Sequence, residues 1–148
     1  MSKKKETKTN AMRILDAAHV DHVVHVVDAT GEDPDHVFKT LVTQGKSGEY
    51  LVFMIPVAAE LDLKKAARAA GEKSVAMVRS RELFDLTGYV HGGCSPLGMK
   101  KFFRTFIDET CVLFDTIMFS GGRIGTQIEM SFDDLAKTIE IEAVDLVV

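Results

Sequence analysis

The stretch VFKTLVTQGKSGEYLVFMIPV, residues 37–57, decides the fold. Its two ends, 37–44 and 49–57, are rich in β-branched, aromatic and other apolar residues, and GKSG between them has the composition of a turn. The pattern predicts two neighbouring strands, both apolar enough to lie in the middle of a sheet. Lys39 stands out, because a lysine in an apolar strand must reach water, form an ion pair or serve a function.

Weaker patterns on both sides of this hairpin alternate between helix and strand. Thr9 or Asn10 is expected to cap the first helix and Asp62 the second. Gly71 is expected to end the second helix and Ser80 to cap the third. Helices are expected at 11–19, 61–71, 80–88 and 131–140, and further strands at 22–28, 74–78, 102–108, 111–114, 116–120 and 126–130. Because strands outnumber helices in mixed order, we expect one α/β or α+β domain around a mixed sheet rather than a doubly wound parallel fold.

Composition narrows the class of protein. The chain has 148 residues, 46% of them hydrophobic, and a formal net charge of −4. These values predict one globular domain at 11–148 after a charged, solvated tail at 1–10, and any contact with nucleic acid is expected to be local. The two cysteines form no CxxC motif, the tail does not lead into the apolar core of a signal peptide, and no apolar run reaches the roughly 18 residues of a membrane span. Together these features predict a cytoplasmic protein without membrane contact.

Three histidines at a spacing of three, His19, His22 and His25, suggest a metal site at first sight. On a helix the third turns away from the first, and on a strand neighbours at this spacing point to opposite faces. Neither geometry gathers the ligands that a tetrahedral site requires. We therefore expect no metal and no cofactor, and we interpret these histidines as a polar rim at the start of the sheet.

A glycine-rich stretch, HGGCSPLGMKK at 91–101, contains two candidate nucleophiles. Cys94 would need a neighbouring base or a helix N-terminus to become a thiolate. Ser95 precedes Pro96 and lies outside the GxSxG pattern of hydrolases. Cys111 begins an apolar run, expected to be a strand, and is interpreted as a small core residue. The glycines either form a turn or let a ligand approach the backbone, and composition leaves both possibilities open.

Four other segments have plain structural interpretations. SGGRIG at 120–125 lacks the dinucleotide-binding pattern GxGxxG and is expected to be a tight turn between strands. The basic clusters at 63–68 and 98–104 are expected to be solvated faces, although either could contact phosphates. Ser131 begins the last predicted helix with Asp134 three residues later, close to the spacing of a capping box.

Five segments in this order resemble the YbaK/EbsC family of Cys-tRNA(Pro) deacylases. They are VFKTLV (37–42), IPVAAELDLKKAA (55–67), TGYVHGGCSPLGMKK (87–101), FIDE (106–109) and SGGRIGTQIEMSFDDLAK (120–137). The resemblance runs from about residue 12 to the C-terminus. It implies a mixed α/β barrel-like fold, shared with the editing domain of bacterial prolyl-tRNA synthetase.

The resemblance also implies an activity and a site. Such proteins remove cysteine from mischarged Cys-tRNA(Pro), alone or together with prolyl-tRNA synthetase. The functional lysine of the family falls on Lys39, which is the catalytic residue expected here. The substrate-binding residues that the resemblance implies are Thr40, Gly92, Gly93, Ser95, Pro96, Ser120, Gly121, Gly122 and Asp134.

In the mechanism that the resemblance implies, the thiol of the substrate cysteine attacks its own carbonyl, while the glycine-rich loop meets the ester through its backbone. Two alternatives stay open: hydrolysis of Ala-tRNA(Pro), and a module that binds aminoacyl-tRNA without catalysis. The chain departs from the family at Val27, a position that usually carries tyrosine. It also departs at 29–32, where only ATGE links the first strand to the segment before Lys39.

Overall fold

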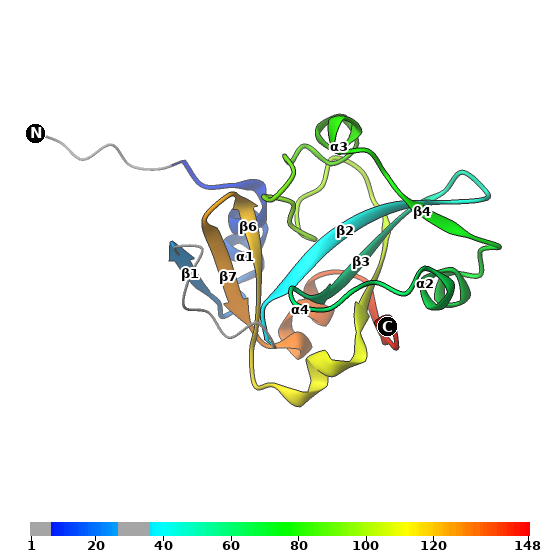
Figure 1. Cartoon of the computed structure of the whole chain (residues 1–148). Helices are drawn as coiled ribbons and strands as arrows, with labels where there is room; N and C mark the ends of the chain where they lie inside the picture. The colour runs from blue at the N-terminus through cyan, green and yellow to red at the C-terminus, as the bar shows by residue number, and fades with distance from the viewer. Residues whose placement is uncertain (1–6, 27–35) are drawn as a thin grey trace, which may run out of the picture.

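Two β-sheets with helices around them form the part of the chain that the computed structural model describes, residues 7–26 and 36–148 (Figure 1). The helices are α1 (Asn10–Ala18), α2 (Leu63–Ala70), α3 (Ser80–Thr87) and α4 (Phe132–Thr138), with the 3-10 helix η1 at Glu109–Leu113. The strands are β1 (Val23–Val26), β2 (Phe38–Gly45), β3 (Tyr50–Pro56), β4 (Val75–Met77), β5 (Arg104–Asp108), β6 (Ile117–Arg123), β7 (Thr126–Met130) and β8 (Ile141–Val144). The mixed α+β class expected from the sequence is confirmed.

The larger sheet contains five strands in the order β4-β2-β3-β5-β8. β2 and β3 pair antiparallel from Phe38 with Pro56 to Gln44 with Tyr50, so the hairpin predicted at 37–57 is confirmed. β5 pairs in parallel with both β3 and β8, which makes the sheet mixed. β4 pairs only with the last three residues of β2, so the first part of β2 has no β4 residue beside it.

The smaller sheet is antiparallel, in the order β1-β7-β6. β6 has an irregular register between Ser120 and Arg123, and a bulge of this kind bends a strand. Within the described residues, one isolated bridge joins the two sheets, and it pairs Val37 with Met118 in parallel. Met118 N donates to His36 O at 2.9 Å beside it. The pairing does not continue, so β2 and β6 separate beyond this bridge.

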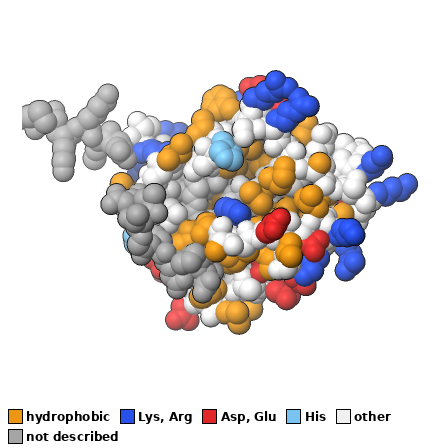
Figure 2. Space-filling view, in the orientation of Figure 1, with side chains coloured by type: hydrophobic (Ala, Val, Ile, Leu, Met, Phe, Trp, Pro, Cys, Tyr) orange, Lys and Arg blue, Asp and Glu red, His pale blue; other side chains and the backbone are white. Residues whose placement is uncertain are grey.

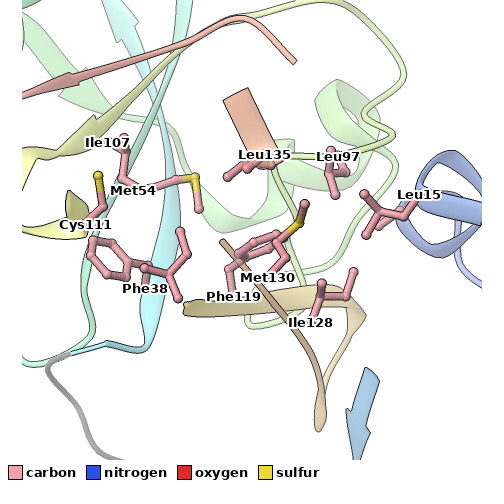
Figure 3. Close-up of a cluster of buried hydrophobic side chains, with 12 residues drawn as sticks. Leu15, Phe38, Met54, Leu97, Ile107, Cys111, Phe119, Ile128, Met130 and Leu135 are labelled. Carbon is pink, nitrogen blue, oxygen red and sulfur yellow. The ribbon is translucent and has the colours of Figure 1, made fainter. Parts of the chain in front are cut away.

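The buried faces of the two sheets pack into apolar clusters. Phe38 of β2 packs with Phe119 of β6, Ile128 of β7 and Leu135 of α4, in the cluster that Figure 3 shows between the sheets. The opposite face of the larger sheet is covered by α2, whose alanines contact β3. This arrangement fixes the positions of β2 and β6, from which the cavity described below is built.

The ends of α1 and α2 follow the sequence signals. Thr9 caps α1 and accepts from Met12 N at 3.2 Å. Asp62 caps α2 by accepting from the backbone N–H groups of Lys64 and Lys65. Gly71 ends α2 with a φ of 72°, a conformation that favours glycine. These caps are confirmed.

One expected strand and one expected helix cap are wrong, because side-chain hydrogen bonds favour a different local structure at each place. The strand expected at 111–114 is replaced by η1 and the residue after it, since the Asp108 side chain accepts from Thr110 N and turns the chain. Ser80 is the first residue of α3 and not its cap. Instead, Glu82 Oε2 accepts from Arg79 N at 3.2 Å.

Two further differences concern the C-terminal third. SGGRIG is not one turn, because residues 120–123 continue β6 and only Ile124 and Gly125 connect it to β7. The helix expected at 131–140 ends at Thr138, and the sequence interpretation did not identify β8 behind it. β8 completes the edge of the larger sheet.

The predicted tail at 1–10 lies only in part within the described residues. Lys8 contacts Asp16, and Asn10 is already the first residue of α1, so the helix begins before residue 11. Val27 and the segment 29–32 lie outside the described residues. Among the helices of 7–26 and 36–148, none is long and apolar enough to cross a membrane.

Candidate functional site

A cavity of about 760 Å³ opens where β2 and β6 separate. Its walls come from β2, the link between β4 and α3, the loop after α3 and the β6–β7 hairpin. In Figure 2, hydrophobic side chains gather across the middle of the face that carries β2, and most Lys and Arg side chains lie toward its edges. The lining residues are Phe38, Lys39, Thr40, Leu41, Val42, Val57, Met77, Val78, Arg79, Ser80, Leu83, His91, Gly92, Cys94, Ser120, Arg123, Ile124, Gly125, Thr126 and Gln127.

Three polar residues of this lining, Lys39, Ser120 and Gln127, come from β2, β6 and β7. Val37 and Met118 are bridge partners in parallel, and Lys39 and Ser120 each lie two residues further along their strands. Ser120 in turn pairs with Gln127 on β7. Because paired residues point to the same face, Ser120 and Gln127 share one face, and both line the cavity together with Lys39. These three residues are called the polar row below. The gap between β2 and β6 separates the lysine from the other two.

Lys39 is half-buried in this lining, and the described part of the chain places no carboxylate within ion-pair distance of its amine. Among the described lining residues there is no Asp or Glu, whereas Arg79 and Arg123 add positive charge. The cationic groups of Lys39 and Arg79 in this lining can attract phosphate oxygens or an ester carbonyl that gains negative charge during reaction. Lys39 therefore lies in the lining of a cavity, and its catalytic role stays a prediction.

Two side-chain oxygens of the cavity have no hydrogen-bond partner among the described residues. They are Thr40 Oγ1 and Gln127 Oε1, and both atoms are buried. Thr40 was identified from the sequence, but Gln127 was missed. The available signal was alternation in TQIEM, where Thr126, Ile128 and Met130 are buried and Gln127 points to the other face.

The two adjacent glycines of the glycine-rich loop, Gly92 and Gly93, have different environments. Gly92 lines the cavity with a φ of 85°, which favours glycine. Gly93 does not line it. A Cβ on Gly93 would lie 3.1 Å from both Arg123 Cα and Ile124 N, so the loop packs closely against the β6–β7 hairpin. Gly93 N donates to Val90 O at 2.9 Å, which uses this N–H group within the loop. The turn and the ligand-approach interpretations thus each describe one glycine.

Four of the expected substrate-binding residues lie behind the cavity wall. Ser95 is fully buried, and its Oγ accepts from Leu97 N at 3.3 Å. Gly121 O accepts from the Thr9 hydroxyl, and a Cβ on Gly122 would come within 2.9 Å of Thr9 Cβ. Besides Gly93 and Asp134, the residues of the expected site that do not line the cavity are Ser95, Pro96, Gly121 and Gly122. They shape the wall and do not face its interior.

Cys94 lines the cavity as a buried thiol. Burial raises its pKa to about 11, and a hydrogen bond with the Thr87 hydroxyl opposes the shift only in part. The thiol is therefore protonated near neutral pH, whereas a cysteine that acts as a nucleophile must be a thiolate. Cys111 is fully buried in the core, and burial raises its pKa to about 12, so its interpretation as a core residue is confirmed.

Replacing Cys94 with alanine should leave deacylation within about tenfold of wild type. The thiol is neutral and packs with Val42 and Leu83, so its loss should cost about 1 kcal/mol of stability through a small cavity. Single-turnover rates and thermal melting of the same protein measure both effects. A rate loss of about a hundredfold with intact folding would instead make Cys94 a nucleophile.

Asp134 lies in the first turn of α4 and does not line the cavity. Ser131 Oγ accepts from Asp134 N at 3.1 Å and caps the helix. Asp134 Oδ1 lies 3.8 Å from Lys137 Nζ, one turn along. These contacts hold the carboxylate at the helix N-terminus, outside the cavity lining.

Asp134→Asn should lower the free energy of unfolding by about 0.5 to 1 kcal/mol, because a negative charge at a helix N-terminus is favourable. Deacylation should remain at the wild-type rate. Asp133→Asn, in the same helical turn, is the matched control and should show a similar loss of stability. An inactive Asp134→Asn with an unchanged melting temperature would place this residue in the site.

The three N-terminal histidines do not converge. His22 Nδ1 lies 2.7 Å from Val20 O, whereas His25 Nε2 lies 2.9 Å from Glu129 Oε1. The Thr116 hydroxyl and His25 both bond to the Glu129 carboxylate and lower its pKa. Over 7–26 and 36–148, no three His, Cys, Asp or Glu side chains are grouped as metal ligands.

Comparison with known sequences adds two findings. Residues 17–138 match the family described as the aminoacyl-tRNA editing domain. The proposed Cys-tRNA(Pro)/Cys-tRNA(Cys) deacylase EbsC of Enterococcus faecalis is 41% identical over an alignment that covers 88% of each chain. The matched range contains every residue of the cavity lining.

Solved structures share the fold across nearly the whole chain. A proposed trans-editing enzyme for prolyl-tRNA synthetase superimposes with a TM-score of 0.82 at 22% identity, covering 97% of this chain and 99% of the other. The hypothetical protein APE2540 gives a TM-score of 0.85 at 18% identity, covering 95% and 100%. At these identities the similarity shows the fold alone.

Proposed function

The chain belongs to the aminoacyl-tRNA editing domain family, and from this premise we propose that it is a deacylase that removes cysteine from mischarged Cys-tRNA(Pro). The observation that carries the proposal is the position of Lys39. This half-buried lysine lines a cavity without described acidic residues, and Ser120 and Gln127 line the same cavity. The name of the E. faecalis relative supplies the substrate class.

Each cavity residue has a role in this proposal. The ammonium group of Lys39 attracts the carbonyl oxygen or terminal phosphate of the substrate and stabilises negative charge in the transition state. Gly92, with its left-handed backbone, leaves space for the ester near the loop. Ser120 Oγ accepts from Gly122 N at 3.1 Å, which orients its hydroxyl in the row. Thr40 offers a second, unpartnered hydroxyl.

The nucleophile in this proposal is the thiol of the substrate cysteine. Its sulfur forms a bond to the carbonyl carbon, the ester bond to the ribose oxygen breaks, and the thiol proton passes to that oxygen. The products are a cyclic thiolactone and uncharged tRNA. The aminoacyl ester is already activated, so positioning and charge stabilisation are the main tasks of the protein. The neutral state of Cys94 agrees with a nucleophile that comes from the substrate.

The substrate defines the partners. Aminoacyl-tRNA of the proline type is the main partner, and prolyl-tRNA synthetase is the second, because mischarged tRNA leaves that enzyme. The structural similarity to a proposed trans-editing enzyme for this synthetase supports the second partner. In this proposal the protein acts in the cytoplasm, where translation uses aminoacyl-tRNA.

Incubation of the purified protein with labelled Cys-tRNA(Pro) and Ala-tRNA(Pro) tests the proposal. Cys-tRNA(Pro) should lose its label at least about tenfold faster, since only cysteine carries a thiol that can cyclise. Mass spectrometry should detect the thiolactone. Faster loss from Ala-tRNA(Pro) would instead indicate hydrolysis by water. Tight binding without release of either amino acid would indicate a module that carries aminoacyl-tRNA.

A further inference from the structure

Gln127 is the residue of the polar row whose chemistry the proposed reaction has not used. Its side-chain oxygen is buried and has no hydrogen-bond partner among the described residues. Buried polar atoms in native proteins are nearly always paired, because water has been removed from them without compensation. Gln127 lines the cavity, as do its pairing partner Ser120 and Lys39.

The residues around Gln127 limit which hydrogen-bonding groups a bound molecule can present to it. A glutamine oxygen only accepts hydrogen bonds, whereas the Thr40 hydroxyl, also unpartnered, can accept and donate. The lining includes Lys39 and Arg79 but no acidic side chain among the described residues, so a cationic donor is disfavoured there. The group that fits is a neutral N–H or O–H.

We propose that Gln127 Oε1 accepts a hydrogen bond from a neutral donor next to the ester of the bound aminoacyl-tRNA, an inference that rests on the proposed function. The substrate carries two such donors: the free ribose hydroxyl beside the ester oxygen, and the α-amine beside the carbonyl carbon. Lys39 and Gln127 then hold the ester from two sides of the gap between the sheets. Gln127 is a residue that positions the substrate and excludes esters without this donor.

A double-mutant cycle between enzyme and substrate tests this contact. The enzyme variants are Gln127→Met, which keeps the side-chain length, and Gln44→Met as matched control, since Gln44 is exposed and its amide donates to Gly48 O in the β2–β3 turn. The substrates are intact Cys-tRNA(Pro), the same tRNA without the free ribose hydroxyl, and tRNA charged with 3-mercaptopropionate, which lacks the α-amine but keeps the thiol.

On the intact substrate, Gln127→Met should lower kcat/KM by about 10- to 100-fold, while Gln44→Met remains at the wild-type value. One of the two modified substrates should lower the wild-type value by the same factor and cause no further loss with Gln127→Met. That substrate identifies the donor. The melting temperature of Gln127→Met should stay the same or rise, because the change removes an unpaired polar atom.

Two results would overturn the inference: full activity of Gln127→Met on intact substrate, or losses that multiply on both modified substrates. A purely structural role predicts the second result together with a lower melting temperature. If the wild-type protein releases no cysteine at all, that result contradicts the proposed function and leaves the Gln127 contact to be tested by binding. Calorimetry with amide-linked cysteinyl-adenosine, with and without each donor, then applies the same cycle to binding.

Discussion

Replacing Lys39 with alanine should lower the single-turnover rate of Cys-tRNA(Pro) deacylation by about a hundredfold or more, the usual scale for loss of one electrostatic stabiliser. The melting temperature should stay the same or rise. Lys39 is half-buried with no ion pair among the described residues, so the change removes a partly desolvated charge without leaving another charge unpaired. The rate and the melting curve should be measured on the same preparation.

Two further variants make this result specific. Lys39→Arg should also be slow, because a planar guanidinium does not replace a compact ammonium in a cavity of fixed shape. Lys46→Ala removes an exposed lysine from the turn at the other end of β2 and should keep the wild-type rate. If Lys39 has a structural role, Lys39→Ala would melt early and keep its rate per folded molecule. A stable, fully active Lys39→Ala would remove this residue from the site.

Gly93→Val should lower the free energy of unfolding by about 1 to 3 kcal/mol and also impair deacylation. A Cβ at Gly93 would lie 3.1 Å from backbone atoms of Arg123 and Ile124, and backbone cannot rotate away as a side chain can. The variant should therefore push the loop away from the β6–β7 hairpin. That movement displaces Gly92 and Ser120, which belong to the two walls that this contact joins.

Gly48→Val separates this effect from ordinary backbone strain. Gly48 has a φ of 98°, so any side chain there is strained, but a Cβ would meet no atom within 4 Å. It lies in the turn between β2 and β3, outside the cavity lining. Gly48→Val should lose stability and keep its rate per folded molecule. If Gly93→Val behaves in the same way, the contact between loop and hairpin does not shape the site.

Local patterns predicted the elements that local interactions determine. The hairpin at 37–57 and the α2 caps, Asp62 and Gly71, are confirmed because strand composition and capping act over a few residues. The strand expected at 111–114 is wrong because a single side chain, Asp108, begins a 3-10 turn. β8 is short, and its place in the sheet depends on parallel pairing with the distant β5, which no local pattern reveals.

The site shows the same limit. Lys39, Thr40, Gly92 and Ser120 were expected from the family resemblance and do line the cavity. Gln127 was missed because its position in the cavity depends on how the two sheets are joined. The bridge between Val37 and Met118 joins them, and no local sequence pattern predicts it. Ser95 and Gly122 were expected in the site for their motif, yet their contacts lie behind the wall.

The pairing of β1 with β7 also has a consequence for the order of events during synthesis. Val26 pairs with Thr126, so the smaller sheet joins an early part of the chain to a late one. Domains fold as their residues leave the ribosome, and a strand cannot pair with a partner that has not been made. The β2–β3 hairpin is therefore available long before the strands that face it. A nascent chain that stops before residue 117 carries Lys39 but lacks β6 and β7, which form the opposite wall of the cavity, so under the proposed function it could not yet act on aminoacyl-tRNA.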